Sequence, residues 1–294
     1  MPPRTNPTER QLRLGAELRK LRERAGVQPP EAAALLGLDR SRISHIEAAR
    51  LGIRPERVQL LAESYGCTDA TFVAALVERA QERSRGWWSS YRGRLKQSTL
   101  DLAELEFHAS YIWTFETLFI PGLLQTEGYA RSIFDGVDYP LSAGELEARL
   151  SFRLQRQQIL VGENAPEYHA IIHEAALRVG VGGPAVMRQQ LLRLIEMGEL
   201  PNVTIQVIPF EGSIHPALNG TYVFLGDEVS ELSTVFVEHP VSSLFIRDSE
   251  SIDRYKNLHA GLARRGLPAV EKMSSGVNSE KSTVGLLQHI LYTL

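Results

Sequence analysis

The fold of this chain is decided by residues 27–47, which read VQPPEAAALLGLDRSRISHIE. The two prolines at positions 29 and 30 suit the first turn of a helix, because the N–H groups that they lack would have no partner there. Gly37 is expected to end that helix, since glycine tolerates the positive φ that follows a helix end. Asp39 is a favourable N-cap, so a second helix is expected over Arg40 to Ala48. The stretch therefore predicts two short helices joined by a tight turn.

The second of these helices is expected to have one apolar face and one polar face. Ile43 and Ile46 lie three residues apart and should face inward, with Leu38 as a buried plug between the two helices. The outer face is left with hydrogen-bonding side chains, which are Arg40, Ser41, Arg42, Ser44 and His45. Such a face is what the major groove of DNA accepts. The alternative is a structural helical hairpin with a solvated basic face.

The flanking residues complete a small helical domain. A first helix is expected within residues 14–26, where Leu14, Leu18 and Leu21 share one face. Arg54-Pro55-Glu56 should begin a fourth helix, and a fifth is expected from about Asp69 to Arg83. The sequence thus predicts an all-α domain of five helices over residues 9–83.

Length and composition indicate two domains in a reducing compartment. A chain of 294 residues with 43% hydrophobic residues is long enough for two ordinary globular domains. No apolar run approaches the ~18 residues of a membrane-spanning helix, and the polar N-terminus lacks a signal-peptide core. Cys67 is the only cysteine, which excludes an intramolecular disulfide. We therefore expect a cytoplasmic protein that does not enter the membrane.

The charge is distributed unevenly along the chain. Residues 1–57 hold 12 Lys and Arg against 7 Asp and Glu, whereas the rest holds 20 of the 32 basic and 28 of the 35 acidic residues. A basic headpiece on an acidic body is typical of a nucleic-acid binder with a regulatory domain. Chance is the alternative explanation of so modest an excess.

Residues 84–94 are interpreted as a hinge rich in aromatic side chains. Trp87, Trp88 and Tyr91 lie within five residues of one another. Exposed aromatic rings are costly, so these rings are expected to dock on one of the domains. Stacking on a ligand or partner is the alternative.

Residues 95–272 are expected to form a second domain of class α+β. Helices are predicted at 98–110, 123–134, 142–161, 183–197 and 248–265, and strands at 111–119, 167–172, 202–209, 221–225, 233–237 and 243–246. The 111–119 segment also leaves a helix open. Because helices come first and strands later, a mainly antiparallel sheet is predicted. The tail, residues 273–294, begins like a linker and ends in a short helix or a strand. It could pack on a neighbouring chain or come from an altered reading frame.

Several motifs carry a resemblance to a known family. Residues 14–47 are similar to the helix-turn-helix region of the lambda-repressor-like (Xre-type) regulators. Farther along, four motifs follow in order, which are GWW (86–88), IPGLLQTEGYAR (120–131), HEAALR (173–178) and LPNVTIQVIPF (200–210). Over residues 10–272 the chain resembles an actinobacterial family of regulators, in which such a headpiece precedes a domain of unknown function.

The resemblance implies transcription regulation, often alongside a small partner protein encoded nearby. Members of the family often have Thr-Gln at the start of the second helix, where the Gln touches the DNA backbone. Here Gln28 stands at that place and is followed by two prolines, which is a departure from the pattern. Gln28 and the outer face of the second helix form the predicted DNA-binding set. Of its two arginines, Arg42 is favoured for reading a base.

No motif of catalysis or metal binding is complete in this sequence. His173-Glu174 lacks the second histidine of a zinc protease, and neither a phosphate loop nor a nucleophile elbow occurs. His173, Glu174, His215 and His239 could converge, although four scattered residues carry little weight. Gly180 to Gly183 could cradle a phosphate, but a turn into a proline-capped helix is favoured. We therefore expect no enzyme, no metal and no cofactor.

Arg149, Arg153 and Arg156 share one face of a predicted helix. Their spacing from Glu145 favours ion pairs on the helix surface, while an anionic ligand or an acidic partner is the alternative. Together with Trp87 and Trp88, these arginines are the candidate ligand or partner residues.

Two functional hypotheses follow. The first is a regulator that binds double-stranded DNA as a homodimer, and whose second domain senses a small-molecule effector or docks a partner protein. The second is an antitoxin-like interaction protein with autoregulatory DNA binding.

Overall fold

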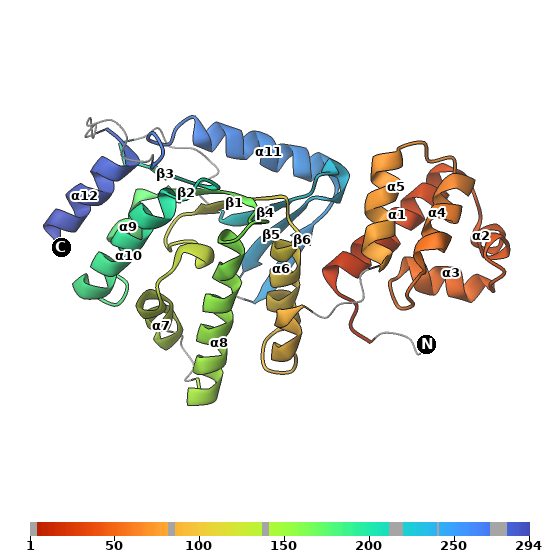
Figure 1. Cartoon of the computed structure of the whole chain (residues 1–294), viewed down its shortest axis with the longest axis horizontal. Helices are drawn as coiled ribbons and strands as arrows, with labels where there is room; N and C mark the ends of the chain where they lie inside the picture. Colours follow the sequence, from red (N-terminus) through yellow and green to blue (C-terminus); the bar gives the residue numbers. More distant parts are fainter. Residues whose placement is uncertain (1–4, 82–85, 137–140, 212–219, 240, 271–280) are drawn as a thin grey trace. The chain divides into compact units, whose positions relative to one another are not determined.

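The chain folds into two compact units. The computed structural model describes residues 5–81, 86–136, 141–211, 220–239, 241–270 and 281–294. The first unit comprises Met1–Ser90 and Gln97–Leu105, and the second comprises Tyr91–Lys96 and Glu106–Leu294. Figure 1 colours the two units from red to blue along the chain. Among the described residues, no helix has the length and apolar character needed to span a membrane.

The first unit contains the helices that the sequence predicts. They are α1 (Glu9–Arg24), α2 (Pro29–Leu35), α3 (Arg40–Glu47), α4 (Pro55–Ser64) and α5 (Ala70–Gln81). The expected end of the fifth helix at Arg83 lies outside the described residues. The unit also takes in most of the 3₁₀ helix η1 (Trp87–Tyr91) and of α6 (Gln97–Phe107), so the predicted count of five helices is too low.

Local hydrogen bonds explain where α1 and α2 begin and end. At the start of α1, the Gln11 side chain accepts the Thr8 N–H at 3.2 Å, as in a capping box. After α2, Gly37 has φ +61°, and the Leu38 N–H donates to the Ala33 carbonyl at 2.9 Å. This is a Schellman ending, which confirms the expected role of Gly37. Asp39 occupies the N-cap position of α3, although its side chain does not cap that helix.

The second unit is built on a mixed sheet. Its strands are β1 (Tyr111–Glu116), β2 (Glu167–His173), β3 (Val203–Ile208), β4 (Tyr222–Gly226), β5 (Thr234–His239) and β6 (Ser242–Ile246), in the spatial order β3-β2-β1-β4-β5-β6. β1 pairs with β2, and β2 with β3, in parallel. The pairs β1–β4, β4–β5 and β5–β6 are antiparallel. The predicted mainly antiparallel sheet is therefore corrected to a mixed one.

The parallel half of the sheet follows from helical connections. Between β1 and β2 lie the short η2 (Gly122–Leu124), α7 (Glu127–Asp135), α8 (Ala143–Arg156) and η3 (Gln157–Leu160). Between β2 and β3 lie α9 (Glu174–Arg178) and α10 (Pro184–Gly198). Helical crossovers of this kind bring the chain back to start the next strand at the same edge, which makes neighbouring strands parallel.

Helices cover both faces of this sheet. Figure 1 shows α11 (Ser249–Ala263) on one face and α7 with α8 on the other. Under α11, Ile252 and Leu262 pack on Phe115 and Phe224 in a continuous buried cluster. The core of the second unit is therefore a three-layer arrangement with the sheet in the middle.

The tail forms a helix that packs on its own unit. α12 (Thr283–Thr293) buries Leu287 and Ile290 and contacts β3 and α10. The Thr283 hydroxyl accepts the Val207 N–H at 3.1 Å. Of the two conformations left open by the sequence, the helix is the one observed. Residues 271–280, which precede α12, lie outside the described part of the chain.

Candidate nucleic-acid interface

The two faces of α3 differ as the sequence predicts. Ile43 and Ile46 are buried. The side chains of the other face are exposed at Arg40, Ser41, Arg42 and Ser44, and half-buried at His45. Leu38 is only half-buried, so the predicted plug is partial, and the fully buried residues of α2 are Ala32 and Ala33. α3 therefore presents a polar surface with two arginines.

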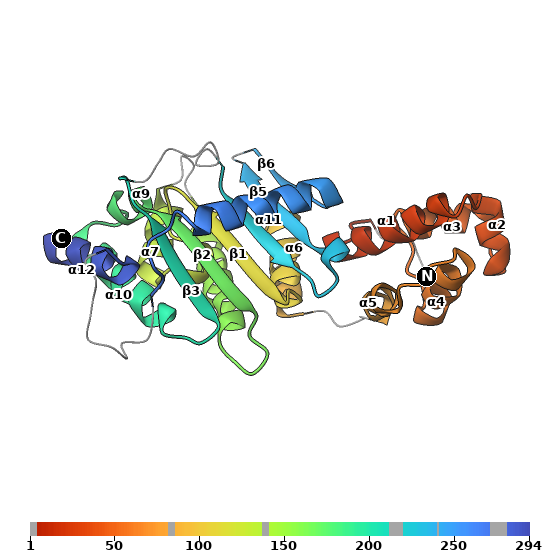
Figure 2. The same cartoon turned by 90° about the horizontal axis from the view of Figure 1, so that it is seen from above.

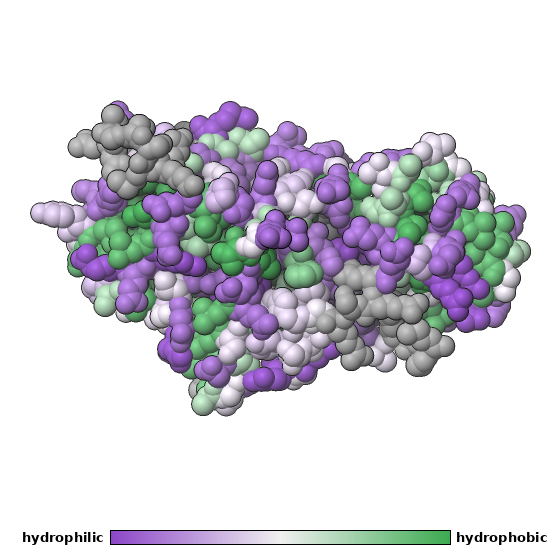
Figure 3. Space-filling model, viewed as in Figure 1, coloured by the Kyte–Doolittle hydropathy of each residue, from purple (hydrophilic) through white to green (hydrophobic). Residues whose placement is uncertain are grey.

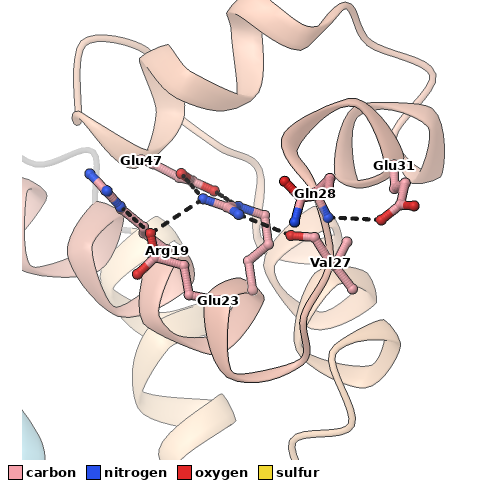
Figure 4. Close-up of polar contacts among 7 residues, drawn as sticks. Arg19, Glu23, Val27, Gln28, Glu31 and Glu47 are labelled. Carbon is pink, nitrogen blue, oxygen red and sulfur yellow. Dashed lines mark hydrogen bonds and ion pairs between the residues drawn. The ribbon is translucent and has the colours of Figure 1, made fainter.

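A largely buried ion pair holds α3 in place. The Arg22 guanidinium, at the end of α1, donates to both carboxylate oxygens of Glu47 at 2.6 and 3.0 Å. It also donates to the Val27 carbonyl at 2.9 Å, in the segment that leads into α2. Glu47, Val27 and their dashed contacts are drawn in Figure 4. The hydrogen bond to Glu47 raises the pKa of Arg22. One bidentate pair thus ties α1, the start of α2 and the end of α3 together.

A close helix crossing supports this pair. Gly15 on α1 lies so near the end of α3 that an added Cβ would overlap the Glu47 carbonyl oxygen. Only glycine allows the two backbones this approach. The position of α3 is therefore fixed from its inner side, which leaves the outer face for contacts.

Gln28 lies at the start of α2. Its backbone N–H donates to the Glu31 carboxylate at 2.8 Å, as Figure 4 shows. Gln28 itself is exposed to solvent. The two prolines that depart from the family pattern occupy the first two positions of α2, where the helix tolerates them. The departure therefore leaves the helix start intact.

After α3 come further arginines that the sequence analysis did not include among the DNA-binding residues. Arg50 and Arg54 are exposed, and Arg57 is half-buried. The chain turns here at Ala49, a buried residue with φ +57°, and Arg54 is the N-cap of α4. The 12 Lys and Arg residues counted over positions 1–57 include these three arginines, so the excess of basic residues could have pointed to them. They extend the positive charge beyond α3.

Of the two tryptophans of the predicted hinge, Trp88 has a packing role and Trp87 is half-buried. Trp88 is only 4% exposed and meets the Trp87 ring edge-on, with 5.9 Å between centroids. Gly86 lies directly against the Trp88 ring, where an added Cβ would overlap it. A buried ring cannot stack on a ligand without rearrangement, so this geometry favours docking for Trp88.

The arginines that share a face of α8 have partners within the second unit, and Arg156 is buried. Arg156 pairs with the fully buried Glu106 at 2.7 Å. Arg153 donates to the Gln125 side chain and lies over the Phe134 ring at 5.0 Å, while Arg149 lies 5.9 Å from the same ring. The favoured interpretation as surface ion pairs is therefore wrong for Arg156, whose acidic partner is fully buried. Arg153 is half-buried and bonds to a glutamine.

The carboxyl groups around these arginines have unusual pKa values. Burial raises the pKa of Glu106 to about 7, against the attraction of Arg156. Burial and then the nearby Glu238 raise the pKa of Glu116 to about 8. Burial lowers the pKa of Arg153 to about 10. Charge inside the second unit is therefore costly, and the ion pairs compensate for it in part.

The IPGLLQT motif contains the short helix η2 and is held by glutamine side chains. Gln125 donates to the Ile120 carbonyl at 2.7 Å, and Gln157 donates to the Gly122 carbonyl at 3.0 Å. The buried Gln190 donates to the Leu124 carbonyl at 2.8 Å. These bonds satisfy backbone groups that have no helix or strand partner. The motif thus has a structural explanation within the second unit.

The residues considered for metal binding also have local partners. The His173 ring accepts the Ala175 N–H at 3.2 Å, and Glu174 binds Arg178 and the Phe210 N–H. His215 lies outside the described residues. Within the described ranges, no group of three or more His, Cys, Asp or Glu residues could hold a metal ion. Gly183, with φ +82°, leads into Pro184 at the first position of α10, which fits the favoured turn.

Comparison of the sequence with known protein families finds one match in each part of the chain. Residues 13–76 match the helix-turn-helix domain, which indicates DNA binding and, with it, a role in transcription regulation. Residues 99–274 match the domain of unknown function DUF5753. Because this match covers more than half of the chain, the protein belongs to the DUF5753 family. Searches of curated proteins and of solved structures found no match.

Proposed function

We propose that this protein is an Xre-type, sequence-specific transcription regulator, whose second unit senses a small molecule or docks a partner protein. The observation that carries the proposal is α3. Its inner side is locked by Ile43, Ile46 and the Arg22–Glu47 pair, while its outer face is exposed and polar. A rigid helix with this face suits the major groove.

The side chains on this face have distinct proposed roles. Arg42 donates two hydrogen bonds to guanine O6 and N7, the commonest specific contact in the major groove. Ser41 and Ser44 are short, so they let the helix backbone approach the duplex and add hydroxyl contacts. His45 contacts a base or a phosphate. Arg40 and Gln28, with Arg50 and Arg54 beyond α3, bind phosphates and set the register.

The second unit acts without turnover in this proposal. The support is that its most distinctive polar residues, Arg153, Arg156 and Gln190, are engaged in internal contacts. A ligand or partner protein would then act by shifting the population of conformations that bind DNA. The partner can be a small protein encoded nearby.

Genome-wide mapping of the DNA bound by the full chain tests this proposal. We expect enrichment of a short sequence motif at promoters, arranged as an inverted repeat with half-sites about one helical turn apart. Enrichment only at the protein's own locus would favour the antitoxin-like alternative. Recovery of DNA without any shared motif would contradict sequence-specific binding.

A further inference from the structure

The two edges of the sheet differ in whether other parts of the chain cover them. At the β3 edge, the Val207 N–H donates to the Thr283 hydroxyl, and the Val207 carbonyl accepts the Leu267 N–H at 2.8 Å. The Ile205 carbonyl accepts the Val270 N–H at 3.1 Å. The segment before α12 and the start of α12 thus cover this edge with hydrogen bonds. An edge covered in this way cannot accept another strand.

The opposite edge is formed by β6. It is last in the strand order, and in the described part of the chain no strand pairs with its outer side. Figure 2 shows β6 and β3 at opposite ends of the sheet. Val241 is 84% exposed and Leu244 is 56% exposed. Phe245 packs on Phe236 at 5.0 Å, which anchors the strand to its own sheet.

Over its five residues, β6 lacks the charged side chains and prolines that protect many edge strands in monomers. Residues 241–246 read VSSLFI, with no charged residue and no proline. Lysines, prolines and inward charges normally prevent edge strands from pairing with other chains. Since β6 has none of them, the composition of the strand permits pairing.

We propose that β6 pairs antiparallel with β6 of a second copy of this chain, with Leu244 opposite Leu244 of the partner subunit. The two sheets would then form one continuous sheet across the dimer. A strand paired antiparallel with itself has two-fold symmetry, so a charged residue would face a like charge at the dyad. The uncharged β6 avoids this repulsion.

DNA binding also favours a second copy of this chain as the partner that pairs with β6. One recognition helix reads too few base pairs for selectivity, and a two-fold dimer presents two of them to an inverted repeat. To this extent the inference rests on the proposed function. It adds to that function the surface through which the dimer forms.

A competing apolar surface provides the control. Figure 3 shows hydrophobic residues gathered at the end of the second unit where α9, α10 and α12 lie. On α10, Leu192 is 53% exposed, close to the value for Leu244. Helices have no unpaired backbone groups along their sides, so strand pairing cannot occur there. Leu192 and Leu244 therefore form a matched pair for substitution.

The test is sedimentation velocity of the full chain without DNA, over a concentration series. The wild type should be dimeric, Leu244→Lys and Leu244→Glu should each lose the dimer, and a mixture of the two should regain it. Leu192→Lys should remain dimeric. Circular dichroism should show native secondary structure for the wild type and all three variants, because both leucines lie at the surface.

Two results would overturn the inference. One is a wild-type monomer throughout the series, and the other is a Leu244→Lys variant that dimerises as the wild type does. A monomer that still binds its DNA sites specifically would refute the strand pairing and leave the proposed function standing. A β6-dependent dimer that binds no DNA would support the strand pairing and refute the proposed function.

Discussion

Arg22 and Arg42 show what a sequence can reveal about a single residue. The spacing of Ile43 and Ile46 places Arg42 on the outer face, and the structure exposes it as predicted. The partner of Arg22 could not be read in this way. Glu47 lies 25 residues away, and the two meet only because Gly15 allows α1 and α3 to cross closely. Periodicity predicts a face, whereas a long-range pair depends on packing.

Glu116 offers a test at the same scale. Its folded pKa of about 8 lies above the ordinary value of 4.5, because burial disfavours the charged carboxylate. Between these values the unfolded state has lost a proton that the folded state keeps, so stability falls as pH rises through this window. Glu116→Gln should remove that loss. Its Tm should exceed the wild-type Tm at pH 8 by about 2–4 °C for each kcal/mol regained.

The measurement is a set of thermal melts of both proteins from pH 5 to 8.5. The gap between the two Tm values should shrink towards pH 5, where the wild-type carboxyl group is protonated. Curves that run parallel over the whole range would show that Glu116 does not titrate in this window.

Among the elements, those with local signals were predicted well. The helices α1–α5 follow from caps, prolines and glycines, and the hairpin spacing predicted the three antiparallel strands β4–β6. The parallel half was missed because helices and strands were read as two blocks. The predicted helices at 142–161 and 183–197 alternate with strands, and alternation of this kind indicates a parallel sheet. α9 has five residues, too few for a periodic pattern.

Ile43→Ala should unfold the first unit. The side chain is 1% exposed between α3 and its neighbours, and removing a buried isoleucine costs about 2–5 kcal/mol. Leu60→Ala is the matched control, because Leu60 is 42% exposed on α4 and should cost about 0.5 kcal/mol or less. Circular dichroism melts of the full chain compare the two. Equal melting behaviour would contradict the inward placement of Ile43.

Thr283→Val tests the link between α12 and the sheet. The substitution removes the acceptor of the buried Val207 N–H, and an unsatisfied buried donor costs about 1–3 kcal/mol. Thr293→Val, at the exposed end of the same helix, should be close to neutral. Urea unfolding midpoints provide the comparison. If Thr283→Val is as stable as Thr293→Val, the helix does not close the β3 edge.

At the scale of the whole molecule, the sequence predicted the class of the first unit and not the use of the second. Arg153 was a candidate ligand residue because it shares a predicted helix face with Arg149 and Arg156, and Trp88 because three aromatic residues lie within five positions. Trp88 is buried and Arg153 bonds to Gln125, so both have internal contacts that composition does not reveal. A recognition helix can be predicted because its function lies within a few consecutive residues. A sensing surface is assembled from distant segments.

We propose that the outer face of α3 reads DNA. The most direct test of this proposal is the affinity of the wild type, Arg42→Ala and Arg254→Ala for a mapped site and its single-base mismatches, over a range of salt. Arg254 is 75% exposed on α11 and controls for the loss of one surface charge. Arg42→Ala should lose about 1–3 kcal/mol of discrimination at one position in each half-site, while Arg254→Ala keeps the wild-type pattern. Unchanged affinity and unchanged mismatch penalties in Arg42→Ala would show that α3 does not read the DNA.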